Sequence, residues 1–243
     1  MQLIVDIGNT RIKSYVFQND TVIESSSQPL ATGASDIRQF LTNYKAINNI
    51  IVSDVNGSLT QKLEVLLSPF PLVYCSSNLN LPFTTLYTPK AQLGADRVAL
   101  LAASCLAYPN TNRLLIDLGS CITYDVIDIM DVHQGGAISP GYAMRYKSMH
   151  TFTGKLPNLT LEYPKDTLGK STSESMHRGV HQGIVNEIKG AIEESEKKYK
   201  DLTVILTGGD AERLPKPVKN SIFAHSNFIA NGLNYILKLN TTL

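Results

Sequence analysis

The chain has 243 residues, 43% hydrophobic and 18% charged, as expected for a folded globular protein of one large or two small domains. Its formal net charge of +1, with no block rich in Lys and Arg, argues against binding to nucleic acid or an anionic membrane. Asp6 and Asn9 interrupt the apolar N-terminus, so we expect no signal peptide, and no apolar run approaches the ~20 residues that span a bilayer. We predict a cytoplasmic protein whose three cysteines, Cys75, Cys105 and Cys121, are free thiols.

The first part of the chain predicts strands followed by helices. Two β-rich runs, 2–7 and 11–18, flank the turn signal Gly8-Asn9, and a third strand covers 21–26. Apolar residues recur with helical spacing from Asp36 to Lys45. The elements expected next are a strand at 49–55, a helix at 59–67, a short strand at 72–75, a loop at 76–90 and a buried, nearly all-apolar helix from Gly94 to about Tyr108.

The pattern then restarts. Strands are predicted at 113–118, 121–127 and 131–138, with Gly135-Gly136 and Pro140-Gly141 as breaks, and the segment 142–170 is rich in turn residues and poorly periodic. A long helix at 174–199, a strand at 203–207 and a closing helix at 227–239 follow. Both halves open with the order β-β-β-α-β-α, which predicts an α/β fold with domains at 1–112 and 113–243 and a linker at 110–112.

The restart repeats a motif. Asp6-Ile7-Gly8-Asn9 and Asp117-Leu118-Gly119-Ser120 each follow an apolar run and precede a second β-rich run. Such a repeat suggests a duplicated domain whose two glycine-turned hairpins hold a ligand between them. In the first copy, Thr10 adds a hydroxyl, and Arg11 and Lys13 share one face of a strand, which favours a phosphate site over an ordinary hairpin only because the second copy exists.

Two further carboxylates have alternative interpretations. Asp117 ends an otherwise apolar run, so it needs a partner, which is either a cation or the backbone that it caps. Asp96 in Gly94-Ala95-Asp96-Arg97 starts the buried helix, where a carboxylate is favourable in any case. The functional alternative is a general base beside a guanidinium that binds an anionic substrate.

Taken together and in order, these motifs resemble those of the type III pantothenate kinases, which belong to the actin/Hsp70/sugar-kinase superfamily. The resemblance rests on Asp6 to Lys13, Tyr87, Leu93 to Arg97, Asp117 to Thr123, Gly135 to Gly141, Thr172 and Thr207 to Asp210. It implies an α/β fold of duplicated ribonuclease H-like (actin-like ATPase) domains with a cleft between them. It also implies ATP-dependent phosphorylation of pantothenate, the first step towards coenzyme A.

The resemblance assigns roles to individual residues. It assigns ATP binding to Asp6, Ile7, Gly8, Asn9, Thr10, Arg11, Ile12, Lys13 and Ser120, and the pantothenate pocket to Tyr87, Gly94, Ala95, Asp96, Arg97 and Thr172. Asp96 would be the general base, and Asp117 would hold a monovalent cation, potassium or ammonium. ATP would come with a divalent metal, Mg²⁺ being expected, and Thr172 would act in a homodimer, from a neighbouring subunit.

One departure and two alternatives accompany this assignment. Ser120-Cys121 stands where the family usually has Thr-Ala, and Ser120 keeps the hydroxyl group that the threonine would supply. The alternatives are another kinase or a phosphatase of the superfamily, acting on a sugar, acetate or polyphosphate, and a non-catalytic, kinase-like regulator. His177 and His181 have the spacing of zinc ligands on a helix, but Arg178 stands where a zinc protease has its glutamate, so we expect no zinc site.

Overall fold

The computed structural model describes residues 1–55, 57, 60–68, 70–164, 166–215, 218, 222–223 and 227–241. The chain packs as two compact units. The first contains Met1–Asn110, Ile129–Gly135 and Asn227–Leu243, and the second contains Thr111–Asp128 and Gly136–Ser226. The division into domains at 1–112 and 113–243 remains a prediction. Among the described residues, none of the helices is long and apolar enough to cross a bilayer.

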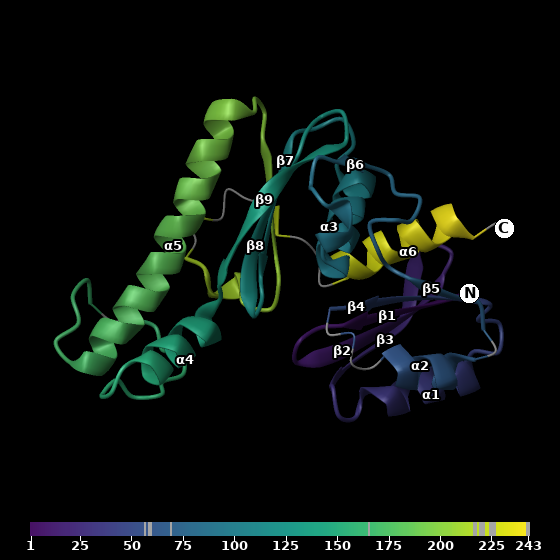
Figure 1. The fold of residues 1–243 in the computed structure, drawn as a ribbon, viewed down its shortest axis with the longest axis horizontal. Coiled ribbons are helices and arrows are strands. Elements are labelled where there is room, and N and C mark those ends of the chain that lie inside the picture. Colours follow the sequence, from purple (N-terminus) through teal and green to yellow (C-terminus); the bar gives the residue numbers. More distant parts are fainter. Residues whose placement is uncertain are drawn as a thin grey trace. The chain divides into compact units, whose positions relative to one another are not determined.

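The first unit is a sheet with helices on both faces (Figure 1). Its strands are Gln2–Ile7 (β1), Arg11–Gln18 (β2), Thr21–Pro29 (β3), Asn49–Asp54 (β4), Leu72–Tyr74 (β5) and Thr84–Thr85 (β6), and its helices are Gly33–Asn43 (α1), Thr60–Leu67 (α2), Ala95–Ala107 (α3) and Phe228–Asn240 (α6), with a 3₁₀ turn at Lys90–Gln92. The main sheet has the order β3-β2-β1-β4-β5, in which β1 is antiparallel to β2 and parallel to β4.

The second unit repeats this topology. Its elements are Arg113–Leu118 (β7), Cys121–Ile127 (β8), Val132–Pro140 (β9, whose first residues belong to the first unit), Tyr142–Phe152 (α4), Thr172–Lys198 (α5), Thr203–Thr207 (β10) and Ile222–Phe223 (β11), with a 3₁₀ turn at Ala211–Arg213. The strand order β9-β8-β7-β10-β11 matches β3-β2-β1-β4-β5, and β7 is antiparallel to β8 and parallel to β10. The α/β class predicted from the repeated motif is therefore confirmed.

Each unit has a hydrophobic core that is built on an apolar central strand, β1 in the first unit and β7 in the second. In β1 every residue is buried, and in β7 all but Asp117 are, because helices cover the sheet as in other α/β folds. The helix α3 is buried from Arg97 to Cys105, as its apolar sequence predicts. It crosses α6 so closely that a side chain at Gly232 would overlap the carbonyl oxygen of Ala99. This closing helix thus packs with α3, β1 and β4 of the first unit.

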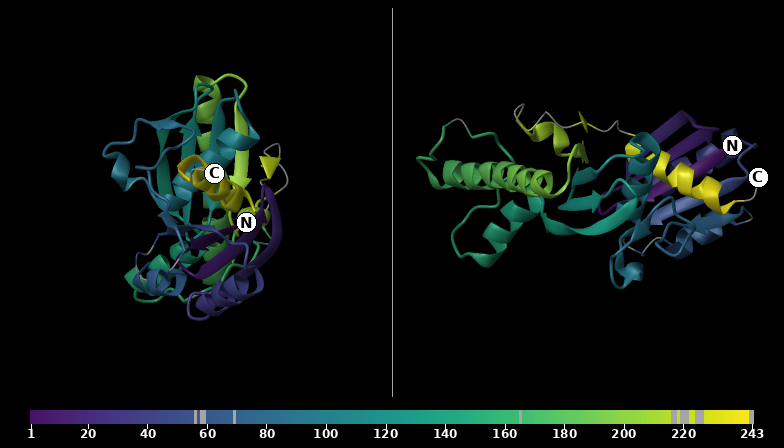
Figure 2. Two further views of the ribbon diagram at one scale, coloured as in Figure 1. Left: turned by 90° about the vertical axis from the view of Figure 1, so that its right-hand side faces the viewer. Right: turned by 90° about the horizontal axis from the view of Figure 1, so that it is seen from above.

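Most predicted elements are confirmed, but three expectations were wrong. The segment after Gly141, expected to be irregular, begins with helix α4, which packs against the first half of α5 through Tyr142 and Tyr146 (Figure 2). The 76–90 loop contains the short strand β6, paired with β9. Gly135-Gly136 does not break β9, and a Cβ at Gly136 would overlap the Tyr124 carbonyl oxygen, so the glycine permits close strand packing instead.

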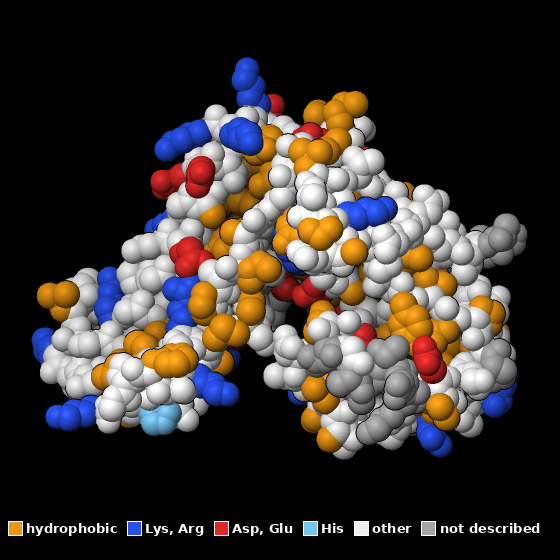
Figure 3. All heavy atoms as spheres, viewed as in Figure 1, with side chains coloured by type: hydrophobic (Ala, Val, Ile, Leu, Met, Phe, Trp, Pro, Cys, Tyr) orange, Lys and Arg blue, Asp and Glu red, His pale blue; other side chains and the backbone are white. Residues whose placement is uncertain are grey.

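The boundaries of two helices, α1 and α5, also differ from the expected ones, and α1 covers Gly33–Asn43 rather than Asp36 to Lys45. The helix α5 starts at Thr172 rather than at Glu174, because the Ser171 side chain accepts a hydrogen bond from the backbone N–H of Glu174 (3.2 Å) and Glu174 in turn accepts one from the N–H of Lys170 (2.7 Å). Charged side chains of both signs lie exposed along its C-terminal end (Figure 3). Leu59, where the sequence places the start of α2, lies outside the described residues.

Candidate functional site

The candidate site of the first unit is built around Asp6, the only polar residue of β1 after Gln2. Asp6 is buried, with 8% of its surface exposed, and the register of the sheet places it opposite Lys13 on β2 and Ser53 on β4. Burial raises the pKa of the Asp6 carboxyl from 3.8 to about 6; the charge of Lys13 and the Ser53 hydroxyl oppose this shift, and the charge of Asp96 adds to it. The structure therefore brings Asp6, Lys13 and Asp96 into one electrostatic neighbourhood.

The turn after β1 differs in detail from the one expected. The backbone N–H of Gly8 donates to the Arg11 carbonyl (3.0 Å), so it closes the hairpin and is not directed at a ligand. The Arg11 guanidinium donates two hydrogen bonds to Ser27 on β3, one from Nε to the side-chain Oγ (2.9 Å) and one from Nη2 to the backbone carbonyl oxygen (2.6 Å). Asn9 and Thr10 are exposed, and Ile7 and Ile12 are buried in the core. Of the groups expected to bind phosphate, the exposed turn and Lys13 keep that capacity.

Asp96 lies in the first turn of α3, for which Gly94 is the N-cap residue. One carboxylate oxygen accepts a hydrogen bond from the backbone N–H of Arg97 (2.8 Å), so the carboxylate lies over the positive end of the helix, which favours its anionic form. A Cβ at Gly94 would lie 2.6 Å from that oxygen, which explains the glycine. Asp96 and Ala95 are half-buried, so this end of α3 remains accessible.

The Arg97 side chain is buried and faces Tyr87. Its guanidinium carbon lies 5.0 Å from the centre of the Tyr87 ring, and Nη1 lies 3.5 Å from the Tyr87 hydroxyl. Arg97 and Tyr87, which the family resemblance assigns to one pocket, are thus in contact although they lie ten positions apart in the sequence. Sequence reasoning missed a third member of this neighbourhood, the Cys75 thiol, which donates to the Ala95 carbonyl (3.5 Å) and whose pKa is raised by burial and by Asp6 and Asp96. That thiol stays protonated and unreactive.

The second unit carries the other copy of the hairpin with different neighbours. Asp117 on β7 is half-buried and lies opposite Thr123 on β8 and Thr207 on β10. Thr123 thus has the position that Lys13 has in the first unit, and Thr207 has the position of Ser53. The chain approaches closely here, since a Cβ at Gly208 (φ +96°) would lie 2.5 Å from an Asp117 carboxylate oxygen. The register therefore puts hydroxyl side chains, whose oxygen atoms are ligands that hard cations prefer, opposite this carboxylate.

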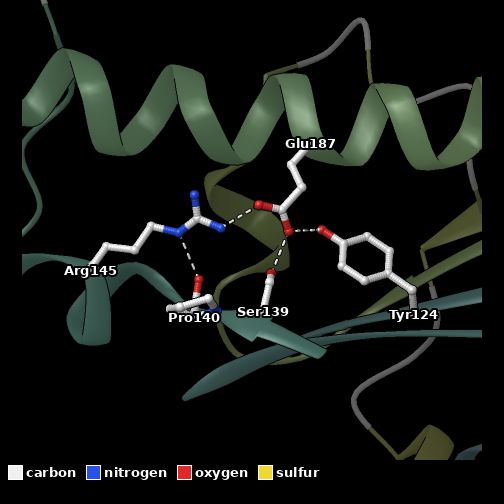
Figure 4. A network of polar contacts seen from close by, with 5 residues as sticks. All are labelled: Tyr124, Ser139, Pro140, Arg145 and Glu187. Atoms are coloured by element: carbon white, nitrogen blue, oxygen red, sulfur yellow. Dashed lines mark hydrogen bonds and ion pairs between the residues drawn. The ribbon is translucent and has the colours of Figure 1, made fainter. Parts of the chain in front are cut away.

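The turn at Gly119-Ser120 is held by the start of α4. Ser120 is exposed, and its carbonyl accepts a hydrogen bond from the Gly141 N–H (3.0 Å); a Cβ at Gly141 would overlap Gly119. A network of polar contacts lies in the same unit. Its centre is Glu187 of α5, which accepts hydrogen bonds from Tyr124 (2.7 Å), from Ser139 and from Arg145 (2.5 Å) (Figure 4).

Arg145 extends this network to the turn. Its Nε donates to the Pro140 carbonyl (2.7 Å), next to Gly141 (Figure 4). Burial tends to raise the pKa of Glu187, but its hydrogen bonds to Ser139, Arg145 and Tyr124 outweigh burial and lower it. The network therefore fixes the segment that carries the Ser120 turn. No periodic pattern along the chain indicates this network, because its members lie on four different elements.

Thr172 and the histidines of α5 lie elsewhere in the second unit. Thr172 is exposed at the start of α5 and lines an open hollow of about 690 Å³ together with Met149, Leu156, Gly169, Lys170, Ser171, Ser175, Met176 and Gly179. The Nδ1 atoms of His177 and His181 lie 2.9 and 3.2 Å from the Tyr146 and Tyr142 hydroxyls. Both histidines therefore join α5 to α4. Among the described residues, no group of three or more potential metal-ligating side chains gathers.

The chain is similar to proteins of known family along its whole length. The family model for type III pantothenate kinases matches residues 2–194. The type III pantothenate kinase of Flavobacterium psychrophilum is 42% identical over 96% of this chain and 97% of its own, and that of Christiangramia forsetii is 43% identical over the full length of both.

Solved structures with low identity share the fold. A protein described as a conserved Baf family transcriptional activator from Campylobacter jejuni superposes with a TM-score of 0.64 at 24% identity, covering 97% of each chain. The activator of 2-hydroxyisocaproyl-CoA dehydratase from Clostridium difficile, solved with bound ADPNP, superposes with a TM-score of 0.56 at 13% identity, covering 97% of this chain and 93% of its own.

Proposed function

The chain belongs to the type III pantothenate kinase family, and we propose how its residues divide the work of that reaction. The protein is a kinase that transfers the γ-phosphoryl group of ATP to pantothenate and forms 4′-phosphopantothenate in coenzyme A biosynthesis. The observation that carries the division of roles is the neighbourhood of Asp6, a buried carboxylate on which the charges of Lys13 and of the half-buried Asp96 both act.

Asp96 is the general base in this proposal. Its carboxylate is half-buried, is held by the N-terminus of α3 and lies next to Arg97, which binds the pantothenate carboxylate. Holding the acceptor by its far end would align its primary hydroxyl with the base, and alignment is what phosphoryl transfer chiefly requires. Tyr87, stacked on Arg97, and Gly94-Ala95 line the same pocket.

Asp6 and Lys13 serve the nucleotide. Lys13 and the exposed turn at Asn9-Thr10 contact the phosphates in this proposal. Mg²⁺ in kinases is held by one or two carboxylates together with substrate phosphates, and the single buried carboxylate of Asp6 fits such a shared site. A cation offsets the cost of burying Asp6 as an anion. When bound, the metal neutralises charge on the phosphates.

Asp117 holds the monovalent cation. The support is the strand register of the second hairpin, which puts two residues with hydroxyl side chains, Thr123 and Thr207, opposite the Asp117 carboxylate. A Cβ at Gly208 would overlap the Leu118 carbonyl oxygen and lie 2.5 Å from an Asp117 carboxylate oxygen, so one backbone oxygen also lies in this region. We expect potassium or ammonium to raise the turnover of the native enzyme, and D117N to abolish that activation while binding of pantothenate persists.

The test of the base is the D96N variant, assayed as pantothenate-dependent ADP release with potassium present. Asparagine still offers an oxygen to the Arg97 N–H, so the fold is kept, whereas loss of a positioned base lowers kcat by ~10²–10⁴. The matched control is D20N, which removes an exposed carboxylate on the first unit. Near-native kcat in D96N would refute the assignment, and turnover of the native enzyme with a different acceptor but not with pantothenate would refute the pocket.

The proposed homodimer has its own test. If Thr172 completes the pantothenate pocket of a neighbouring subunit, T172A and D96N are each impaired alone, but co-expressed with different tags they form hybrid dimers with one intact site. Purified hybrids should then regain activity. Hybrids without activity would show that Thr172 acts in its own subunit, whereas a T172A variant with native activity on its own would show that Thr172 has no such role. Light scattering gives the mass of the assembly.

A further inference from the structure

A fully buried histidine supports the Tyr87 side of the pocket. His133 on β9 has no exposed surface, and its ring stacks on Tyr87 with 6.2 Å between centroids and 17° between planes. Tyr87 in turn lies against the Arg97 guanidinium, 5.0 Å from the ring centre. Phe83 also contacts the histidine, edge-on, with ring centroids 6.5 Å apart. The tyrosine ring is therefore held between a buried imidazole and a guanidinium.

A hydroxyl fixes the backbone of the same tyrosine. The Thr85 Oγ1 accepts a hydrogen bond from the Tyr87 N–H (3.0 Å) and lies 2.8 Å from the His133 Nδ1. Thr85 and His133 are partners in the β6–β9 pairing, so the sheet itself sets this geometry. Both the ring and the main chain of Tyr87 thus depend on contacts with this Thr85–His133 pair.

We propose that His133 is a positioning residue that, with Thr85, orients Tyr87 against Arg97 and so sets the enzyme's selectivity for an acceptor that carries a carboxylate. The inference rests on the proposed function of Arg97. A guanidinium held by a ring in one orientation presents its N–H groups to a planar carboxylate in a fixed direction. If the ring is released, Arg97 keeps its charge but loses that direction, so a charged acceptor loses more than an uncharged one.

The experiment compares kcat/KM for pantothenate with that for pantothenol, in which an alcohol replaces the carboxylate. The variants are H133A, H133F, T85V and R97M, with T84V as the control, because Thr84 lies beside Thr85 on β6 but is exposed. Loss of one aromatic contact corresponds to about a 2- to 10-fold change, so we expect the selectivity ratio to fall about that much in H133A and T85V. H133F keeps the ring and should retain most of the ratio.

The outcomes separate the inference from its premise. A purely structural role would lower kcat/KM for both acceptors equally and leave the ratio at its native value in H133A and T85V, which would overturn the inference. R97M should collapse the ratio; if it does not, the pocket assignment fails instead. Should H133A fail to fold, T85V still decides, since valine has nearly the shape of threonine but lacks the hydroxyl that contacts Tyr87 and His133. T84V should match the native enzyme for both acceptors.

Discussion

Burial of Asp6 has a cost in stability that depends on pH. Its pKa is about 6 in the folded protein and near the ordinary 3.8 when the chain is unfolded, so between these values the folded state binds more protons. Stability should therefore be highest below pH 4 for this group and fall as the pH rises through 6. Each pH unit between the two pKa values corresponds to ~1.4 kcal/mol, so the full loss is about 3 kcal/mol.

The D6N variant removes this titration. In urea unfolding without ligands, we expect the difference in unfolding free energy between D6N and the native protein to move in favour of D6N by about 2–3 kcal/mol between pH 4 and pH 8. The control, D20N, removes an exposed partner of Lys238 and should change little at any pH. A difference for D6N that is constant across this range would refute the argument that burial perturbs Asp6.

The same titration should appear in activity. If Asp6 holds Mg²⁺ as proposed, the metal needs the ionised carboxylate and competes with its proton, so KM for ATP should rise as the pH falls below about 6. KM for pantothenate should not follow the same curve.

Three further changes test the geometry. K13M should raise KM for ATP by ~10- to 100-fold, the worth of a charge-assisted hydrogen bond, and an unchanged KM would remove Lys13 from the phosphate site. E187A should cost about 1–3 kcal/mol in urea unfolding because it leaves Arg145 without this partner, with E187Q milder; equal midpoints would show that the network contributes no stability. G232A should destabilise by about 1–3 kcal/mol, since its Cβ would overlap the Ala99 carbonyl oxygen, unless α3 and α6 separate without cost.

The repeated Asp-x-Gly motif predicted much of the fold, because strand-forming runs and a turn signal are local properties. The strands β1, β2, β7, β8 and β10 begin and end where their residues indicate. Helix α4 was missed for a physical reason. It is stabilised by its tyrosines, paired with histidines of α5 that lie more than thirty residues away, and not by an apolar stripe of its own.

For the candidate site, too, some features follow from the sequence and others from the tertiary structure. The sequence alone determined the repeat, the family resemblance and the choice of Asp6, Lys13, Asp96 and Asp117 as candidates. These features depend only on the type of each residue and on its order along the chain. Only the tertiary structure decided their surroundings. Pairing between strands places a lysine against one aspartate and a threonine against the other, and buries His133 against Tyr87. Burial and strand register join residues far apart in the chain, so no local pattern contains them.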